Sequence, residues 1–386
     1  MTTKNFTIAL VLKTMGLEYD DRVRKEILSV QRLYPNVKFK IFALLPDNKE
    51  TESVTDYGVP YKSLFIPALE KYPSSTKLYL KGWQFYQAVR KDLKSFDAVW
   101  VADVETFCVT TFVKTQHLLW DLHELPYQMF DSKWKRMLLK HTLNRCDVVV
   151  HANPQRAQYM KNLRLIDDMS KHYVLRNYPN VEDVDTEYDG AYHSFVEWKN
   201  GRKCVYLQGL HSRVRAASES VEAVMRKEDL CAVVVGGFNP EIKQQLKDKF
   251  GEQLEQRVFF VGKTPQMKIP QYVQQCFMAL VFYTNVRPNN WYCEANRFYQ
   301  AVIMGLPVVV GANPPMKEIV EKYGFGVSID DDGTHVDKIV KGMEDVLHNY
   351  SQYKDNIIKN RNLLTWNRQD SVIKEIVDRL MRQKTL

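Results

Sequence analysis

The chain has 386 residues, which is more than one ordinary hydrophobic core accommodates, so its length predicts two domains of roughly 150–200 residues each. Hydrophobic residues make up 45% of the sequence and charged residues 26%, as is typical of a folded soluble protein. The net charge of +8 points to anionic partners, which include phosphorylated ligands, nucleic acid and acidic membrane surfaces.

Several classes of protein are excluded by what the sequence lacks. No apolar run approaches the roughly 18 residues of a membrane span, and the N-terminal stretch does not follow the plan of a signal peptide. The 6 cysteines are scattered and form no Cys-x-x-Cys pair. We therefore expect a cytoplasmic protein with reduced thiols, without disulfides, a zinc site or another bound metal.

Short apolar runs rich in β-branched and aromatic residues recur along the chain and alternate with helical patterns. In chain order they are 6–13, 39–45, 98–103, 118–124, 148–153, 204–209, 231–237, 257–262, 278–283 and 307–312. Strands that are apolar on both faces and alternate with helices predict parallel sheets covered by helices. The sequence therefore predicts an α/β protein with two doubly wound, Rossmann-like domains.

The boundary between the two domains is marked by a change of composition. Residues 178–203 are acidic, rich in turn-forming residues and without periodicity. We expect an N-terminal domain at 1–182, a linker at 183–202, a second domain at 203–365 and a C-terminal helix at 366–386 that packs back on the first domain. Ligands of such sheets bind outside the carboxyl ends of the strands, so residues that follow strands are the first candidates for a site, in a cleft between the domains.

In the first domain two loops after strands carry polar residues. Gly16, Asp20 and Arg22 follow the first strand, and Asp20 is also a candidate cap of the next helix. His123 and Glu124 end the run at 118–124, and a histidine at the carboxyl end of a strand is a candidate functional residue.

In the second domain Gly209 ends a strand, and Arg213 and Arg215 follow before a helix that is predicted to begin near Ala216. Two guanidinium groups beside the start of a helix indicate a clamp for a diphosphate. The alternative is a solvated basic loop.

The stretch Glu294–Gly311 predicts a helix, a Gly-x-Pro break and a buried strand. Asn296, Arg297 and Gln300 fall on the first turns of the helix, where a basic group and two amides could bind phosphate and sugar hydroxyl groups. The alternative is an ordinary amphipathic helix with Phe298 and Val302 in the core, and both interpretations can hold together.

Two segments, 75–94 and 127–145, are helical in pattern and combine basic with aromatic residues. This pattern suits reversible contact with anionic lipid headgroups, and the alternative is a solvated helix face. Nucleic acid would leave a similar charge signature, but the chain contains no recognised nucleic-acid-binding module, so no nucleic-acid partner is expected.

Several motifs resemble those of the GT-B glycosyltransferases of the retaining GT4-like group (glycosyl transferases group 1). They are DDRVRKEILSV, WDLHELP, RCDVVVHAN, VLRNYPNV, VYLQG, FFVGKTP and ANRFYQAVIMGLPVVVGANPPMKEIVEKYGFGV. The likeness runs over nearly the whole chain in the right order. It implies two Rossmann-like domains that face each other across a cleft and the transfer of a sugar without a metal.

The same resemblance implies a UDP- or GDP-linked sugar as donor substrate rather than a bound cofactor, and a glycan or lipid-linked acceptor in polysaccharide biosynthesis. A lipid-linked acceptor would place the protein at the inner face of the membrane. By position, Arg213 and Arg215 resemble the family's diphosphate-binding pair and His123 its histidine beside the donor sugar. Further positions that match the donor site are Asn296, Arg297, Lys263 and Thr264.

The sequence departs from the family at two acidic positions. Gln300 and Tyr292 stand where the family has a pair of glutamates, and Glu294 is a candidate replacement for the second of them. The departure keeps open a catalytically weak chain that acts as a binding or scaffold partner, and a sugar-nucleotide epimerase or a phosphorylase. In an inverting branch, Glu124 or Asp20 would be the candidate base.

Overall fold

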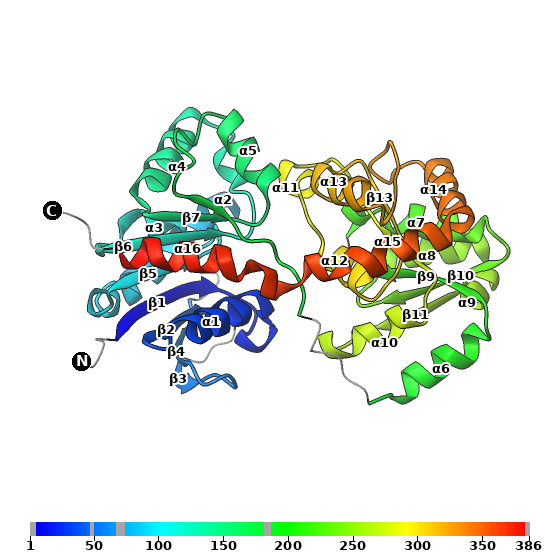
Figure 1. The fold of residues 1–386 in the computed structure, drawn as a ribbon, viewed down its shortest axis with the longest axis horizontal. Helices are drawn as coiled ribbons and strands as arrows, with labels where there is room; N and C mark the ends of the chain where they lie inside the picture. The colour runs from blue at the N-terminus through cyan, green and yellow to red at the C-terminus, as the bar shows by residue number, and fades with distance from the viewer. Residues whose placement is uncertain (1–4, 47–49, 67–73, 181–186, 211, 383–386) are drawn as a thin grey trace. The chain divides into compact units, whose positions relative to one another are not determined.

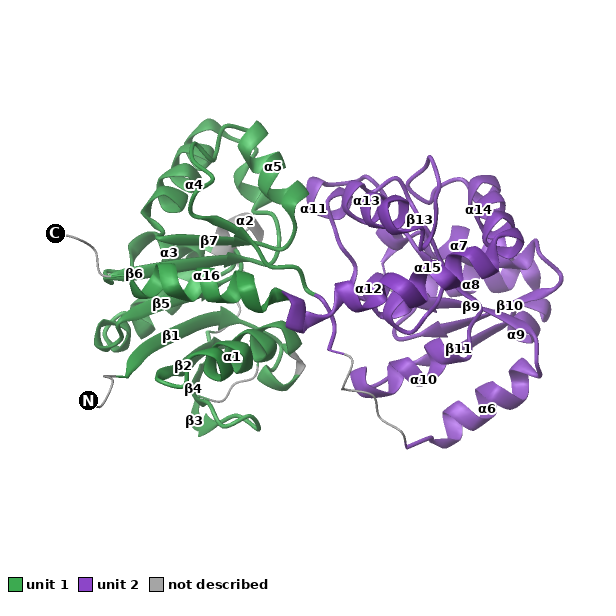
Figure 2. Cartoon of the chain, viewed as in Figure 1, with its two compact units in different colours: residues 1–177, 369–386 green, residues 178–368 purple. Residues whose placement is uncertain are grey.

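The computed structural model describes residues 5–46, 50–66, 74–180, 187–210 and 212–382. It divides into two compact units (Figure 2). Unit 1 comprises residues 1–177 and 369–386, and unit 2 comprises residues 178–368. The C-terminal residues therefore return to the first unit.

Unit 1 is built on an 8-stranded sheet in the order β3-β4-β2-β1-β5-β6-β7-β8 (Figure 1). Its strands are β1 (Phe6–Lys13), β2 (Val37–Leu44), β3 (Thr51–Val54), β4 (Pro60–Leu64), β5 (Ala98–Ala102), β6 (His117–Leu122), β7 (Val148–His151) and β8 (His172–Val174). Its helices are α1 (Asp21–Leu33), α2 (Ser74–Val89), α3 (Phe107–Phe112), α4 (Lys133–Arg145), α5 (Pro154–Asn162) and α16 (Asp370–Met381). All strand pairs are parallel except β3 with β4.

Unit 2 is built on a 6-stranded, fully parallel sheet in the order β11-β10-β9-β12-β13-β14. Its strands are β9 (Lys203–Gln208), β10 (Leu230–Val235), β11 (Val258–Gly262), β12 (Met278–Val281), β13 (Val308–Val310) and β14 (Gly326–Ser328). Its helices are α6 (Gly190–Lys199), α7 (Ala217–Met225), α8 (Pro240–Phe250), α9 (Gln253–Arg257), α10 (Ile269–Gln274), α11 (Pro288–Trp291), α12 (Asn296–Ile303), α13 (Pro314–Tyr323), α14 (Val336–His348) and α15 (Tyr350–Asn360).

The sheet of unit 2 is buried on both faces, as its apolar strands predict. Tyr206 of β9 lies in one hydrophobic core with Phe298 of α12, whereas its neighbours Val205 and Leu207 lie in a second core with Val221 of α7. Successive side chains of a strand point to opposite faces, so a strand that is covered on both sides must be apolar throughout. The predicted fold class, two parallel-sheet α/β domains, is confirmed.

Each predicted apolar run contains a strand, but β3, β4, β8 and β14 were not predicted. Three of them lie at the edges of their sheets, where one side of the strand is unpaired and an apolar sequence is not required. β3 is exposed along its whole length, and its sequence TESV carries no hydrophobic run. Edge strands of this kind have no signal in the apolar pattern.

The segment predicted as a linker contains a helix. Asp189 caps α6 by accepting a hydrogen bond from the backbone N–H of Tyr192, and Tyr192 and Phe195 are buried in a hydrophobic core of unit 2. Only these two side chains of the short helix are fully buried, with Trp198 packed against the same core, which is too few for a periodic pattern to be seen in the sequence.

The C-terminal helix α16 packs beside α1 in unit 1 and also contacts β6, β7 and β8 (Figure 1). An ion pair joins the two helices. Arg32 of α1 donates two hydrogen bonds, of 2.7 and 2.8 Å, to the carboxylate of Asp370 in α16. The last helix is thus part of the first unit, although the chain reaches it through the second.

Candidate functional site

The strand order of unit 2 reverses between β9 and β12, because β10 and β11 lie on one side of this pair and β13 and β14 on the other. Ligands of doubly wound sheets bind outside the carboxyl ends of the strands at such a reversal. Arg297 lies at this point. Its guanidinium donates to the carbonyl of Gln208 at the end of β9 and to the carbonyl of Phe282 just after β12, both at 2.8 Å.

Arg297 is only 5% exposed, and burial lowers the pKa of its guanidinium below the ordinary value. Its charge lies 4.9 Å from the centre of the Tyr283 ring, which offers a cation–π contact. The sequence predicted that Arg297 binds the ligand. The structure places its guanidinium at the ends of β9 and β12, where it joins the two halves of the sheet.

Three neighbouring strands end in glycines with positive φ. The φ angles are 60° at Gly209, 88° at Gly236 and 84° at Gly262. The N–H of Gly209 donates to Val235 and the N–H of Gly236 donates to the carbonyl of Gly262, at 2.8 and 2.7 Å. Glycine adopts this conformation without strain and leaves the backbone open to a ligand. The residues at these three positions therefore project no side chain of their own, and at Gly209 the space is taken by the guanidinium of Arg215.

Arg215 is tied to this edge, whereas Arg213 is not. Arg215 donates from Nη1 to the carbonyl of Gly209 at 2.6 Å, and a Cβ atom at position 209 would lie 2.8 Å from that nitrogen. The side chain of Arg213 is 66% exposed and pairs with Glu241 at 3.2 Å. The two predicted clamp residues therefore differ, and only Arg215 has a defined place at the carboxyl edge.

The remaining predicted residues of unit 2 surround α12 and β11. Asn296 is exposed in the first turn of α12, and Gln300 is partly buried one turn later. The carboxylate of Glu294 accepts a hydrogen bond from Tyr299, which is fully buried. Lys263 is exposed after β11, and Thr264 donates to the carbonyl of Gly262 at 3.1 Å.

The first predicted loop of unit 1 has mainly local roles. Gly16 is buried, and Asp20 caps α1 by accepting a hydrogen bond from Val23 N at 3.4 Å. The strand order of unit 1 reverses between β1 and β5, and at this point Lys13 pairs with Glu105 at 3.1 Å. Because the carboxylate of Asp20 accepts the capping bond, the structure favours the capping role over the catalytic one.

His123 follows β6 and is 19% exposed, whereas Glu124 beside it is exposed. Nε2 of His123 lies 3.3 Å from Oδ2 of Asp121, a carboxylate with no exposed surface. Burial alone would lower the pKa of His123, but the charge of Asp121 outweighs it and raises the pKa to about 9. The histidine is therefore a cation at neutral pH.

Sequence reasoning missed Asp103, which follows β5. It is a non-glycine residue with a φ of 64°, and burial raises the pKa of its carboxyl to about 6, opposed in part by His123. Non-glycine residues in this region of φ are uncommon and gather at functional sites. The signal in the sequence was an acid at the end of the strand predicted at 98–103.

Three side chains of unit 1 have the donor atoms of a cation site, since ligand atoms of Glu26, Asp121 and His123 lie within 4.8 Å of one another. A cation is already in place there, because the guanidinium of Arg22 lies 2.9 Å from Glu26 and 3.0 Å from Asp121. We therefore interpret this cluster as an internal ion-pair network and not as a metal centre.

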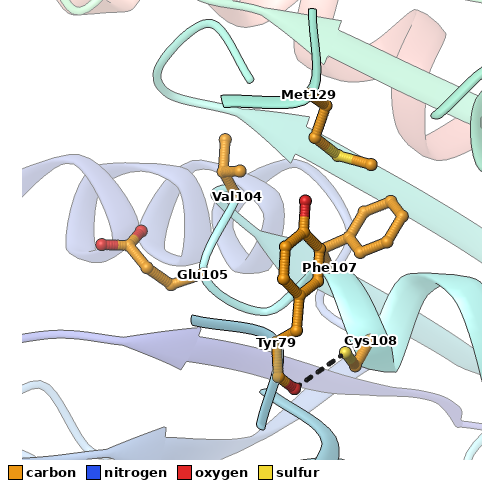
Figure 3. Close-up of a pocket in the computed structure, with 6 residues that line it drawn as sticks. All are labelled: Tyr79, Val104, Glu105, Phe107, Cys108 and Met129. Carbon is orange, nitrogen blue, oxygen red and sulfur yellow. Dashed lines mark hydrogen bonds between the residues drawn. The ribbon is translucent and has the colours of Figure 1, made fainter. Parts of the chain in front are cut away.

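A small apolar hollow lies next to the carboxyl end of β5 (Figure 3). It is lined by Tyr79, Val104, Glu105, Phe107, Cys108 and Met129. The thiol of Cys108 contacts the backbone carbonyl of Tyr79 at 3.5 Å, which narrows the hollow at its base. Its empty volume of about 230 Å³ includes space open to solvent, so the hollow does not enclose a ligand.

The basic residues of 127–145, which were predicted to face a membrane, differ in whether their side chains have partners within the protein. Lys135 pairs with Asp131, Lys140 pairs with Asp167, and Arg145 donates to two backbone carbonyls. Arg136 donates from Nε to the carbonyl of Phe130 at 2.6 Å but stays exposed on α4, as does Lys133. They lie beside Trp134 and Met137, whose side chains are 59% and 64% exposed. The basic and aromatic surface is therefore smaller than the sequence predicted.

In the part of the chain that the structure describes, no helix combines the length and the apolar character needed to cross a bilayer.

Residues 203–363 match the family model of glycosyl transferases group 1. This match covers most of unit 2 and includes Gly209, Gly236 and Gly262 at the strand ends, Arg215 and α12. No curated protein sequence matches the chain.

Solved structures with the same fold cover nearly the whole chain. Sucrose-phosphate synthase from Thermosynechococcus elongatus aligns with a TM-score of 0.75 at 15% identity, over 97% of this chain and 99% of that one. α,α-Trehalose 6-phosphate synthase from Burkholderia multivorans aligns at 0.72 and 10% identity, over 97% and 99%. HepE from Anabaena in complex with UDP-glucose aligns at 0.68 and 14% identity, over 97% and 100%.

The fold is thus the GT-B fold of two parallel-sheet α/β domains, and the predicted resemblance is confirmed. Residues 203–363 match the glycosyl transferases group 1, and the enzyme class that this match and the GT-B fold support is a glycosyltransferase.

Proposed function

We propose that the chain transfers a sugar from a nucleotide diphosphate sugar to a glycan or lipid-linked acceptor, with retention of configuration and without a metal. The observation that carries this proposal is the carboxyl edge of unit 2. There the guanidinium of Arg215, the glycines that end β9, β10 and β11, and the start of α12 lie at the carboxyl ends of the strands, beside the point where the strand order reverses. The structure of HepE with UDP-glucose supports a UDP-linked donor.

The chemistry of this edge suits a diphosphate leaving group. As the bond between sugar and phosphate breaks, negative charge grows on the diphosphate, and a preorganised guanidinium stabilises that charge. Arg215 uses one N–H group on Gly209, and a guanidinium has further donors for a ligand. The backbone N–H groups in the first turn of α12 carry the positive end of the helix dipole. Gln300 would donate to or accept from a ribose hydroxyl group.

In unit 1 the residues that suit the sugar and the acceptor are His123 and Asp103. His123 is a cation, as its pKa of about 9 indicates. It is therefore suited to donate a hydrogen bond to an oxygen atom of the nucleotide sugar and not to act as a base. Asp103 has a pKa of about 6, which suits contact with an acceptor hydroxyl group. In an inverting reaction, Asp103 would be a better base than Glu124, which is exposed.

The first test is nucleotide binding followed by turnover. We expect UDP or GDP to raise the melting temperature, because a ligand that binds the native state stabilises it, and CMP to have no effect. The nucleotide that binds then selects the nucleotide sugar for an assay of slow hydrolysis. Binding without hydrolysis or transfer would favour a scaffold. A product formed without an acceptor, or a dependence on free phosphate, would favour an epimerase or a phosphorylase.

We further propose that α4 contacts an anionic membrane surface, which would bring the enzyme to a lipid-linked acceptor in polysaccharide biosynthesis at the inner face of the membrane. Lys133 and Arg136 supply positive charge, and Trp134 and Met137 supply apolar side chains that already face solvent. Each basic residue near an anionic surface contributes on the order of 1 kcal/mol, and this contribution decays within about a Debye length.

The membrane proposal predicts that the protein sediments with phosphatidylglycerol vesicles at low salt and is released as the salt concentration rises. The double variant Lys133→Glu/Trp134→Ala should lose this binding, because it removes one charge and one apolar anchor. The matched control is Lys359→Glu/Ile358→Ala on α15, which also changes an exposed lysine and an exposed apolar residue, the latter 57% exposed. Equal sedimentation of both variants would contradict a role of α4.

A further inference from the structure

Behind His123 lies a buried network of charged residues that the sequence did not reveal. Asp121 has no exposed surface, and its two carboxylate oxygens have different partners. Oδ1 accepts a hydrogen bond from Nη2 of Arg22 at 3.0 Å, and Oδ2 lies 3.3 Å from Nε2 of His123. Asp121 lies in β6 and points to the face on which α1 lies, since Arg22 of α1 contacts it, and His123 follows the end of the same strand.

Arg22 is fixed from several sides. Besides Asp121, its guanidinium donates from Nη1 to the carbonyl of Leu175 at 3.0 Å, and its Nε lies 2.9 Å from Oε1 of Glu26. Arg22 is 6% exposed and Glu26 is 1% exposed. Burial and the negative charge of Asp121 raise the pKa of Glu26 well above its ordinary value.

The carboxylate of Asp121 stays ionised. Burial would raise its pKa, but the charges of Arg22 and then His123 outweigh this effect and hold the pKa far below its ordinary value. An ionised carboxylate only accepts hydrogen bonds, so Nε2 of His123 must carry a hydrogen atom. Among the described residues, Nδ1 has no partner, and it is the ring nitrogen left for a ligand.

We infer that Asp121, held by Arg22, is a positioning residue that ties Nε2 of His123 inward and presents Nδ1–H to the substrate as a hydrogen-bond donor. This inference rests on the proposed function, since it assigns the substrate contact of His123. The backbone of His123 is held as well, because Arg156 of α5 donates to its carbonyl oxygen. Ring and backbone are therefore both anchored, as a preorganised donor requires.

The protonation of His123 decides what Nδ1 can do. In the imidazolium form Nδ1–H donates to an oxygen atom of the nucleotide sugar, whereas in the neutral form with a hydrogen atom on Nε2 it can only accept. The donor is thus present below the pKa of about 9 and is lost as the pH rises through it. The charged or titratable groups that face this region are Asp121 and Glu124 in the same segment, Arg22 and Glu26 on α1, Asp103 and Glu105 after β5, His151 on β7 and Arg156 on α5.

The test is a titration of the His123 ring by NMR in the ligand-free, full-length protein with labelled histidine. The signal is assigned by its absence in His123→Gln. In the wild type we expect a midpoint near pH 9 and, above it, nitrogen shifts of the form that carries its hydrogen atom on Nε2. This measurement needs neither turnover nor a variant of the network. A midpoint near the ordinary value, or a hydrogen atom on Nδ1 above it, would overturn the inference.

Variants of the network then show which residue raises the pKa of His123. Asp121→Asn should lower the midpoint by roughly 1–3 pH units, because the nearby negative charge is lost. Glu26→Gln should lower it less than Asp121→Asn does, because Glu26 raises the pKa of His123 less than Asp121 does. The matched control is Asp97→Asn, at the amino end of the neighbouring strand β5, where the carboxylate accepts hydrogen bonds from Thr7. That change should affect stability and not the titration of His123.

Turnover separates the inference from the proposed function. With the nucleotide sugar that the wild type uses, Asp121→Asn should lower kcat about 10²-fold, with a smaller effect on KM, and should move the alkaline fall in activity to lower pH. Unchanged kcat and an unchanged pH profile would show that the network is structural only. If the titration behaves as expected but the wild type neither transfers nor hydrolyses any nucleotide sugar, the proposed function fails while the coupling of Asp121 to His123 stands.

Discussion

Replacement of Arg215 by alanine should lower turnover by roughly 10²–10³-fold, the loss expected when a preorganised charge donor is removed. The guanidinium is anchored on the carbonyl of Gly209 at 2.6 Å and lies 5.7 Å from the centre of the Tyr283 ring. The guanidinium of Arg215 therefore has a fixed place beside Gly209 before any ligand binds. The measurement is kcat for hydrolysis or transfer at saturating nucleotide sugar.

Arg213 is the matched control, because it has the same charge and lies two residues away. Its side chain is 66% exposed and pairs with Glu241, so solvent and salt screen its charge. We expect Arg213→Ala to change turnover by less than about tenfold, which corresponds to roughly 1.4 kcal/mol. Equal losses in both variants would mean that the two arginines act as a pair. Normal turnover in Arg215→Ala would remove Arg215 from the mechanism.

The central strands could be predicted because they are covered on both faces and so need long apolar runs. The rule that ligands bind at the carboxyl ends of parallel strands then selected Gly209, Arg215 and His123 without any structure. Edge strands such as β3 escaped prediction, because an exposed strand of four residues carries no hydrophobic signal. The helix α6 escaped for a similar reason, as only Tyr192 and Phe195 are buried in it.

Within the candidate site, the sequence indicated candidate residues but not the partners that the folded chain gives them. Arg297 and Arg213 read alike as basic residues near a helix start, yet one is 5% exposed and the other is on the surface. The network of Arg22, Glu26 and Asp121 joins residues about a hundred positions apart in the chain, as the separation of 99 between Arg22 and Asp121 shows. No local pattern indicates such a contact, so only the folded chain reveals it.

Replacement of Arg297 by methionine should destabilise unit 2 and weaken nucleotide binding together. Methionine keeps the apolar stem but has no N–H groups, so the carbonyls of Gln208 and Phe282 lose their donor at the reversal of the strand order. Each buried carbonyl left without a partner costs about 1–3 kcal/mol, and we expect the free energy of unfolding to fall by about 3 kcal/mol. Urea denaturation measures this change.

The control for this prediction is Arg257→Met, because the guanidinium of Arg257 also donates hydrogen bonds to backbone carbonyls. It donates to Val224 at 2.7 Å, to Met225 at 2.9 Å and to Leu230 at the start of β10, which is the amino edge of the same sheet. Arg257→Met should therefore destabilise the protein without changing the affinity of the folded fraction for UDP. Arg297→Met should weaken that affinity about tenfold or more, because the two strand ends that frame the ligand are no longer joined. If both variants bind UDP as the wild type does, measured by calorimetry below their melting temperatures, then Arg297 supports the fold alone and does not shape the site.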